Sequence, residues 1–175
     1  KTQAYYASAD GEPGDERGKG FDTILDAPGF AGGPLSYWTS QAIKLQGVNL
    51  VGRESLVPSL RSSKTEGQPN FVNPGLFLAG AGYDADLTPK LRLAANVNYL
   101  RFIDMKSLEI FINQSNLDHN IGLDYGLGLF YRPLLNNNIS AALVANALSP
   151  LGAIDEIYEA PGTQYSVLTS LTFRY

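Results

Sequence analysis

The strongest constraint on how this chain folds is a period-two alternation of apolar and polar residues in its second half. Five stretches between residues 74 and 175 show it. The third is the most regular, with apolar positions at Ile121, Leu123, Tyr125, Leu127, Leu129 and Tyr131. Successive side chains of a β-strand point to opposite faces, so each stretch predicts a strand with one apolar and one polar face. The sequence therefore predicts an all-β, antiparallel fold.

Charged residues in these stretches are confined to the polar faces, and the apolar faces hold none. The charges expected in the lumen or at its rim are Asp84, Asp86, Arg92, Asp124, Arg132 and Arg174. A soluble antiparallel sheet with one buried face shows the same alternation. The pattern alone therefore leaves both a soluble sheet and a membrane sheet open.

Three further features favour a transmembrane barrel. The alternating stretches last about 10 to 13 residues, whereas soluble strands average about 5 to 6 and transmembrane strands need about 9 to 11. Short links at 87–90 and 133–137 alternate with long links at 103–120 and 148–164, as in outer-membrane barrels. Tyrosines favour membrane interfaces, and here they lie towards the ends of the stretches: Tyr83, Tyr99, Tyr125, Tyr131, Tyr165 and Tyr175.

The 175 residues suit a single domain with two unequal parts. Residues 10–73 are irregular and rich in Gly, Pro, Ser and acids, whereas residues 74–175 form a five-strand meander. Counting a poorer strand at 2–9, we expect about six strands of an up-and-down transmembrane β-barrel, with 10–73 as one very long extracellular loop. Known single-chain barrels start at eight strands. We therefore expect both sheet edges to pair with the remainder of the barrel, supplied by an upstream segment or another chain.

Composition argues against several functional classes. Seventeen acidic against thirteen basic side chains give a net charge of −4, without the basic face that nucleic-acid-binding proteins show. The absence of Cys removes disulfides and thiolate metal sites. The single histidine, His119, has no second histidine to share a metal or a proton relay, and we expect it at the rim. With no Gly-x-Ser-x-Gly elbow either, we expect no enzyme.

Two features of the 10–73 segment are candidate binding elements. An acidic run bent by Gly and Pro could hold a hard cation such as calcium, through Asp10, Glu12, Asp15, Glu16 and Asp22. The run lacks the ligand spacing of an EF-hand, and a solvated acidic loop without a cofactor is the alternative that we favour. Trp38, near Tyr37 and Phe30, either stacks on a sugar or anchors the loop. A segment this long must pack on itself, which favours the anchor.

The last stretch, Tyr165-Ser-Val-Leu-Thr-Ser-Leu-Thr-Phe-Arg-Tyr175, resembles the C-terminal strand of Gram-negative outer-membrane proteins. The resemblance implies that residues 1–175 are the C-terminal portion of one outer-membrane barrel domain. It also implies an assembly signal that the barrel-assembly machinery reads through Tyr165, Val167, Leu171, Phe173 and Tyr175. Outer-membrane lipid would be a further partner.

The opening Ala4-Tyr-Tyr-Ala-Ser-Ala-Asp10, with Gly20-Phe-Asp22 and Gly33-Pro-Leu-Ser-Tyr-Trp38, is similar to segments of alginate-export-type porins. In that family a strand ending in Ser-Gly-Asp enters a long outer loop. The similarity implies porin-like passive passage of small polar solutes or polysaccharide through a lumen that the loop narrows. A structural barrel that docks or sheathes a partner complex, and a soluble all-β binding module, remain alternatives.

Overall fold

The computed structural model describes residues 1–12, 15, 19–20, 32–40, 74–135, 138–159 and 162–174. Their elements are β1 (Thr2–Ala7), a 3₁₀ turn η1 (Gly33–Leu35), α1 (Tyr37–Ser40), β2 (Leu76–Thr88), β3 (Leu91–Arg101), α2 (Lys106–Ile112), β4 (Asn120–Tyr131), β5 (Ile139–Pro150), α3 (Gly152–Ile157) and β6 (Gln164–Phe173). Of the predicted site residues, Glu16, Asp22 and Tyr175 lie outside the described residues. Most of the predicted 10–73 loop lies outside them as well.

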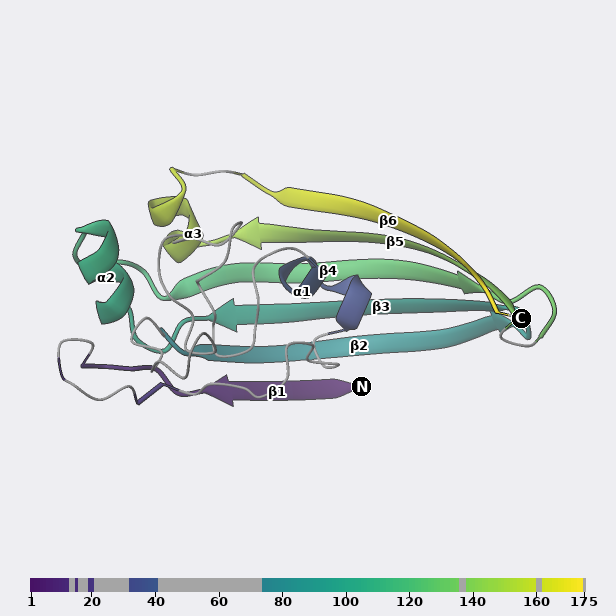
Figure 1. Cartoon of the computed structure of the whole chain (residues 1–175), viewed down its shortest axis with the longest axis horizontal. Coiled ribbons are helices and arrows are strands. Elements are labelled where there is room, and N and C mark those ends of the chain that lie inside the picture. The colour runs from purple at the N-terminus through teal and green to yellow at the C-terminus, as the bar shows by residue number, and fades with distance from the viewer. Residues whose placement is uncertain are drawn as a thin grey trace.

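The six strands form one antiparallel sheet in chain order, β1-β2-β3-β4-β5-β6, as Figure 1 shows. The predicted all-β antiparallel meander is therefore confirmed. Short links join β2 to β3 and β4 to β5 at one end of the sheet, which we name the turn end. Long links join the other strand pairs at the opposite end, the loop end. At the β2–β3 turn, the Thr88 hydroxyl accepts the N–H groups of Lys90 and Leu91, which stabilises a tight connection.

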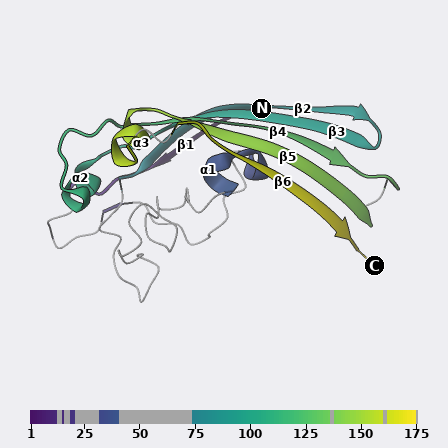
Figure 2. The ribbon, with the colours of Figure 1, turned by 90° about the horizontal axis from the view of Figure 1, so that it is seen from above.

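The sheet is strongly curved, with the helices and the 3₁₀ turn on its concave side (Figure 2). Its convex face carries the apolar phase of the sequence, and many of these side chains are exposed. Tyr165 is 81% exposed and Val167 66%. The other large exposed members are Tyr83, Val97, Leu123, Tyr125, Leu127, Leu129, Tyr131, Leu143, Leu171 and Phe173. The polar phase lies on the concave side, where Asn98, Asp124 and Asn146 are buried.

One residue departs from the predicted phase. Ile121 was expected to point outward with the rest of its stretch, but it is fully buried. In the β3–β4 register, Leu100 pairs with Gly122 and Arg101 with Asn120, so Ile121 has no partner across the ladder. Such a β-bulge inserts one extra residue and re-aims its side chain. The outward phase of β4 therefore begins at Leu123.

An apolar core fills the concave side at the loop end, where α2 and α3 also lie (Figure 1). Its fully buried large members are Trp38, Leu76, Leu78, Leu100, Phe102, Leu108, Ile121 and Leu148. The Trp38 and Phe102 rings meet edge to face at 6.3 Å. Burial of each such side chain contributes roughly 1.5–3 kcal/mol to the free energy of folding, so this core fixes α1, α2 and α3 against the sheet.

Within the described residues the sheet is open. β1 and β6 are its two edges and do not pair with each other. The expectation that other strands complete a barrel therefore stays a prediction. No helix among the described residues combines the length and hydrophobicity that a membrane-crossing helix requires.

Candidate functional site

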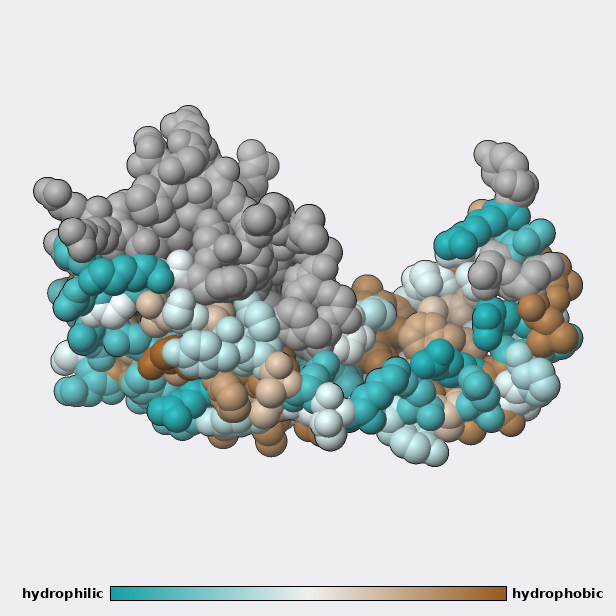
Figure 3. Space-filling model, turned by 90° about the horizontal axis from the view of Figure 1, so that it is seen from below, coloured by the Kyte–Doolittle hydropathy of each residue, from teal (hydrophilic) through white to brown (hydrophobic). Residues whose placement is uncertain are grey.

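The concave face divides into two neighbouring regions between the apolar core and the turn end. The first is the seat of residues 32–40, which contain η1 and α1 and which we name the inner segment. The second is a hollow of about 670 Å³ between the inner segment and the turn end. Figure 3 shows the concave side hollowed towards the turn end. Both regions are built from the polar phase of the strands.

Asp124, in the middle of the sheet on β4, is the centre of the seat and is fully buried. Its carboxylate accepts the Ser36 hydroxyl at 2.5 Å and the Tyr37 backbone N–H at 2.7 Å. The Asn98 side-chain amide on β3 donates to it at 3.1 Å. A buried carboxylate is tolerated only when such donors satisfy it, and hydrogen bonds to a charged acceptor are among the strongest in proteins. Asp124 therefore joins the inner segment firmly to the concave face of the sheet.

A second polar row attaches the same segment to the last two strands. The Asn146 amide nitrogen on β5 donates to the Pro34 carbonyl at 2.9 Å and to the Ser40 hydroxyl at 3.2 Å. The Ser166 hydroxyl on β6 donates to the Asn146 side-chain oxygen at 2.6 Å. The inner segment is thus held at both of its ends, and β6 is tied into the same network.

Glycines of the polar phase make room for these contacts. A Cβ at Gly126 on β4 would collide with the backbone carbonyl of Leu35, and one at Gly128 would crowd the Leu35 side chain. A Cβ at Gly80 on β2 would collide with the Asn98 side-chain oxygen. The concave face of the sheet therefore has the shape that the inner segment requires. The sequence alone did not predict this fit. The signal for it was the run of glycines opposite Leu127 and its neighbours.

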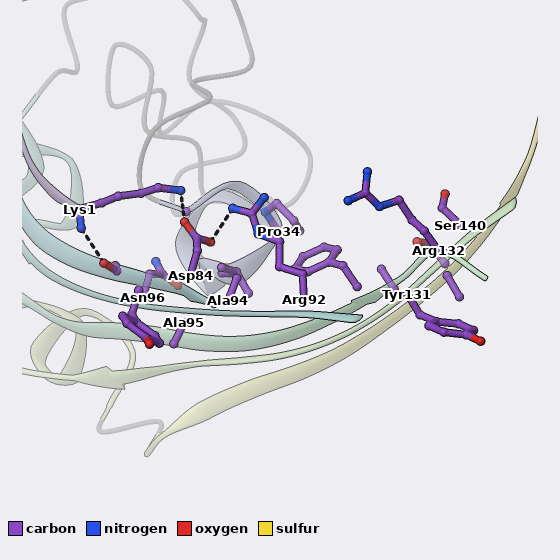
Figure 4. A pocket seen from close by; sticks show the side chains of 18 of the residues that line it. Lys1, Pro34, Asp84, Arg92, Ala94, Ala95, Asn96, Tyr131, Arg132 and Ser140 are labelled. Atoms are coloured by element: carbon purple, nitrogen blue, oxygen red, sulfur yellow. Dashed lines mark hydrogen bonds and ion pairs between the residues drawn. The ribbon is translucent and has the colours of Figure 1, made fainter. Parts of the chain in front are cut away.

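The turn-end hollow is lined mainly by cations and small side chains. Arg92 on β3 lies 3.0 Å from the Asp84 carboxylate on β2, and the Lys1 ammonium pairs with the same carboxylate. In Figure 4 these three side chains meet at one side of the hollow, and Arg132 lies on the concave side further along. Three cationic side chains and one carboxylate line the hollow among the described residues. The Arg92–Asp84 ion pair therefore lies on the concave face, and its expected place at the rim of a lumen stays a prediction.

The structure separates the six predicted lumen charges into three environments. Asp84, Arg92 and Arg132 line the hollow. Asp124 is buried beneath the inner segment instead of facing open space. Asp86 and Arg174 are exposed near the turn end and outside the hollow lining.

A lysine side chain pairs with carboxylates of the predicted cation-binding run. The Lys19 ammonium lies 2.6 Å from the Glu12 carboxylate and 2.9 Å from that of Asp15. Hydrogen bonds to these two carboxylates raise the pKa of Lys19 above its usual range. Asp10 accepts the backbone N–H groups of Glu12 and Lys19. Calcium binding here would have to displace the ammonium, and in the described part of the chain no group of three or more acidic or histidine side chains has metal-binding geometry.

The remaining candidates lie at the loop end and on β6. Trp38 is fully buried beside Phe102, the position expected of a loop anchor. The His119 ring nitrogen lies 3.2 Å from the Phe102 carbonyl at the start of β4. The residues proposed as an assembly signal are exposed along the edge strand β6: Tyr165, Val167, Leu171 and Phe173.

Comparisons of the chain with protein-family models, with curated proteins and with solved structures find no match. Three features of the sheet bear on function: the exposed apolar convex face, the inner segment bound to Asp124 and Asn146, and the charged hollow at the turn end.

Proposed function

We propose that this sheet is part of the wall of a transmembrane β-barrel in the outer membrane of a Gram-negative bacterium. The protein acts as a porin-like channel through which small polar solutes or polysaccharide pass without energy input. The observation that supports the proposal best is the distribution of side chains across the sheet. Large apolar side chains are exposed on the convex face, and polar ones are buried on the concave face.

Water is a poor solvent for such a convex face. Soluble monomers rarely expose apolar patches larger than a few hundred Å², and each Å² left in water forgoes about 25 cal/mol. Lipid removes this cost. The strand lengths agree with a membrane location, since β2 to β6 contain 13, 11, 12, 12 and 10 residues. Transmembrane strands need about 9–11 residues.

The concave side supplies a polar path. The hollow offers guanidinium groups, a carboxylate and the hydroxyls of Ser140 and Ser170 to a hydrated solute. The inner segment lies on the same face and narrows the space beside the wall. In a closed barrel, β1 and β6 pair with strands from the remainder of the barrel, because an unpaired N–H or C=O group in lipid costs several kcal/mol.

One observation favours a second function, a structural barrel that docks or sheathes a partner complex. The apolar core at the loop end, together with α2 and α3, occupies the concave side where a wide pore would need open space. Such a barrel would present a plugged wall and its outer loops to a partner, and it would conduct little.

Single-channel recording in a planar bilayer tests the proposal. The purified protein should insert and give discrete conductance steps. Insertion without conductance would favour the structural barrel. A protein that stays monomeric and folded in buffer without detergent would instead be a soluble all-β binding module, and the membrane proposal would fail.

The orientation can be tested separately by labelling single cysteines on intact cells, since the chain has no native Cys. Cysteine at exposed Gly162, at the loop end, should react with a membrane-impermeant maleimide. Cysteine at exposed Leu134, at the turn end, should react only after the outer membrane is opened. The reverse pattern would contradict the proposal that the turn end is periplasmic.

A further inference from the structure

We propose that Asp124 is the positioning residue that holds the inner segment across the concave face and thereby sets the width of the solute path. The anchoring part of this proposal follows from the contacts of the described residues. The part about width rests on the proposed channel function. The two parts have separate measurements, so the failure of one is distinguishable from the failure of the other.

The contacts of Asp124 come from two directions. Ser36 and the Tyr37 N–H reach it from the inner segment, and Asn98 reaches it from the neighbouring strand. Asn98 is itself fixed, because its side-chain oxygen accepts the Gln3 amide of β1 at 2.8 Å. The carboxylate therefore connects the inner segment to β4, β3 and β1 at one level of the sheet. Among the described residues, Asp124 supplies the one carboxylate with a hydrogen bond to this segment.

The shape of the wall makes this position specific. Leu35 lies so close to Gly126 that no Cβ fits between them, and the Leu35 side chain packs near Gly128. The Pro34 carbonyl is held from the other side by Asn146. The inner segment therefore has one seat on the wall, and Asp124 supplies the charged contact within it.

Loss of the carboxylate should release the segment. Without it, the Ser36 hydroxyl, the Tyr37 N–H and the Asn98 amide lose their acceptor in a buried site. Each hydrogen bond to a charged group contributes a factor of about 10 to 100 to an equilibrium. Removing these bonds shifts the population towards conformations in which the inner segment leaves the wall.

Trp38 reports this release directly. It is the only tryptophan of the sequence, it lies within the inner segment, and it is fully buried. Asp124→Ala should shift its emission to longer wavelength and raise its quenching by acrylamide severalfold. Asp124→Asn should give an intermediate change, since it keeps an acceptor for Tyr37 and the Ser36 hydroxyl can donate or accept. Trp38→Phe gives the background signal.

The matched control is Asp86→Ala. It removes one carboxylate from the same polar phase, and no hydrogen bond or ion pair joins Asp86 to the described inner segment. Trp38 quenching should stay at the wild-type level in this variant. A folded Asp124→Ala protein with wild-type quenching would overturn the anchoring. If Asp124→Ala fails to fold, Ser36→Ala decides. It removes one of the hydrogen bonds to Asp124, together with the bond that the Ser36 hydroxyl accepts from the Thr39 N–H within the inner segment. Unchanged quenching there would overturn the proposal.

The width is measured with neutral polymers of increasing size added during single-channel recording. Asp124→Ala should admit larger polymers than the wild type and show a higher conductance. A released Trp38 with an unchanged size limit would overturn the role in width and leave the anchoring intact. A wild-type protein that inserts without conducting would sink the channel function, whereas the fluorescence experiment would still decide the anchoring.

Discussion

The two ends of the concave face show what one alternating pattern can build. Along β3, the concave side carries Leu100 at the loop end, then Asn98 and Asn96, then Ala94 and finally Arg92 at the turn end. The loop end is closed by an apolar core beneath α2 and α3. The turn end is hollow and charged. The polar row between the two ends holds the inner segment.

The difference between the two ends arises from the side chains that point to the concave face, which we call the inward phase, and not from the backbone. At the loop end, Leu78, Leu100 and Leu148 point inward and need cover, which the helices and Trp38 provide. At the turn end, the inward positions of the same strands carry Asp84, Arg92 and small residues, which water can solvate. The outward phase stays apolar over both ends. The sheet thus varies its inner surface while keeping one outer surface.

The largest expected effect separates two phenylalanines on the concave side. Phe102 is fully buried in the loop-end core, whereas Phe130 is only partly buried beside the hollow. Phe102→Ala should lower the free energy of unfolding by about 3–5 kcal/mol. Phe130→Ala should cost less than half as much, because part of its ring already contacts the hollow. Urea unfolding in lipid vesicles measures both, and equal losses would show that the loop end is no more tightly packed.

The next effect tests the outer surface. Leu127→Arg places a charge on the convex face of β4, where 51% of the leucine is exposed. Near the bilayer midplane this should cost about 2–4 kcal/mol and reduce assembly. Ser170→Arg, on the hollow side of β6, should assemble normally. The fraction that resists SDS without heating gives the comparison, and equal assembly of both variants would contradict a lipid-facing convex side.

Alternation alone would make Gly126→Arg the natural control for Leu127→Arg, because Gly126 belongs to the polar phase. The structure shows why that control is unsuitable. The Leu35 carbonyl occupies the space beside Gly126, so a large side chain there displaces the inner segment. Alternation reveals which way a side chain points, but it carries no information about a segment almost a hundred residues away.

The predictable part of the fold was the part set by local chemistry. Period-two alternation identified the strands and their faces, and the lengths of the intervening segments identified which links are short and which are long. The bulge at Ile121 was not predictable, since it depends on the register against Leu100 and Arg101. Nor was the burial of Asp124, which depends on Ser36 and Tyr37 folding back onto β4. The leucines of the inward phase, such as Leu78 and Leu100, were the available sign that one end is closed.

A smaller effect concerns two glycines of the inward phase. Gly126→Ala should force the inner segment away from β4 and cost about 1–3 kcal/mol through overpacking. A Cβ at Gly82, nearer the turn end, would lie 3.3 Å from the Ala95 carbonyl and 3.8 Å from the Asn96 Cβ, so Gly82→Ala should be close to neutral. Urea unfolding and Trp38 quenching together measure the two variants. Similar behaviour would mean that the seat of the inner segment is not specific to the middle of the sheet.

The smallest effect is expected from the charges of the turn end. Arg92 is about half exposed and lies 3.0 Å from Asp84 across the β2–β3 ladder. Exposed pairs of this kind contribute about 0.2–1 kcal/mol, so Arg92→Glu should slightly lower the free energy of unfolding. The loss should shrink in 1 M salt, where screening shortens to about 3 Å. Arg174→Glu is the control, because no ion pair joins Arg174 to another described residue.

Ion selectivity should change little in Arg92→Glu if this pair is a rim salt bridge. A large change in selectivity, measured as the reversal potential in a salt gradient, would instead make the turn end a filter. In that case the two ends would differ in function as well as in packing.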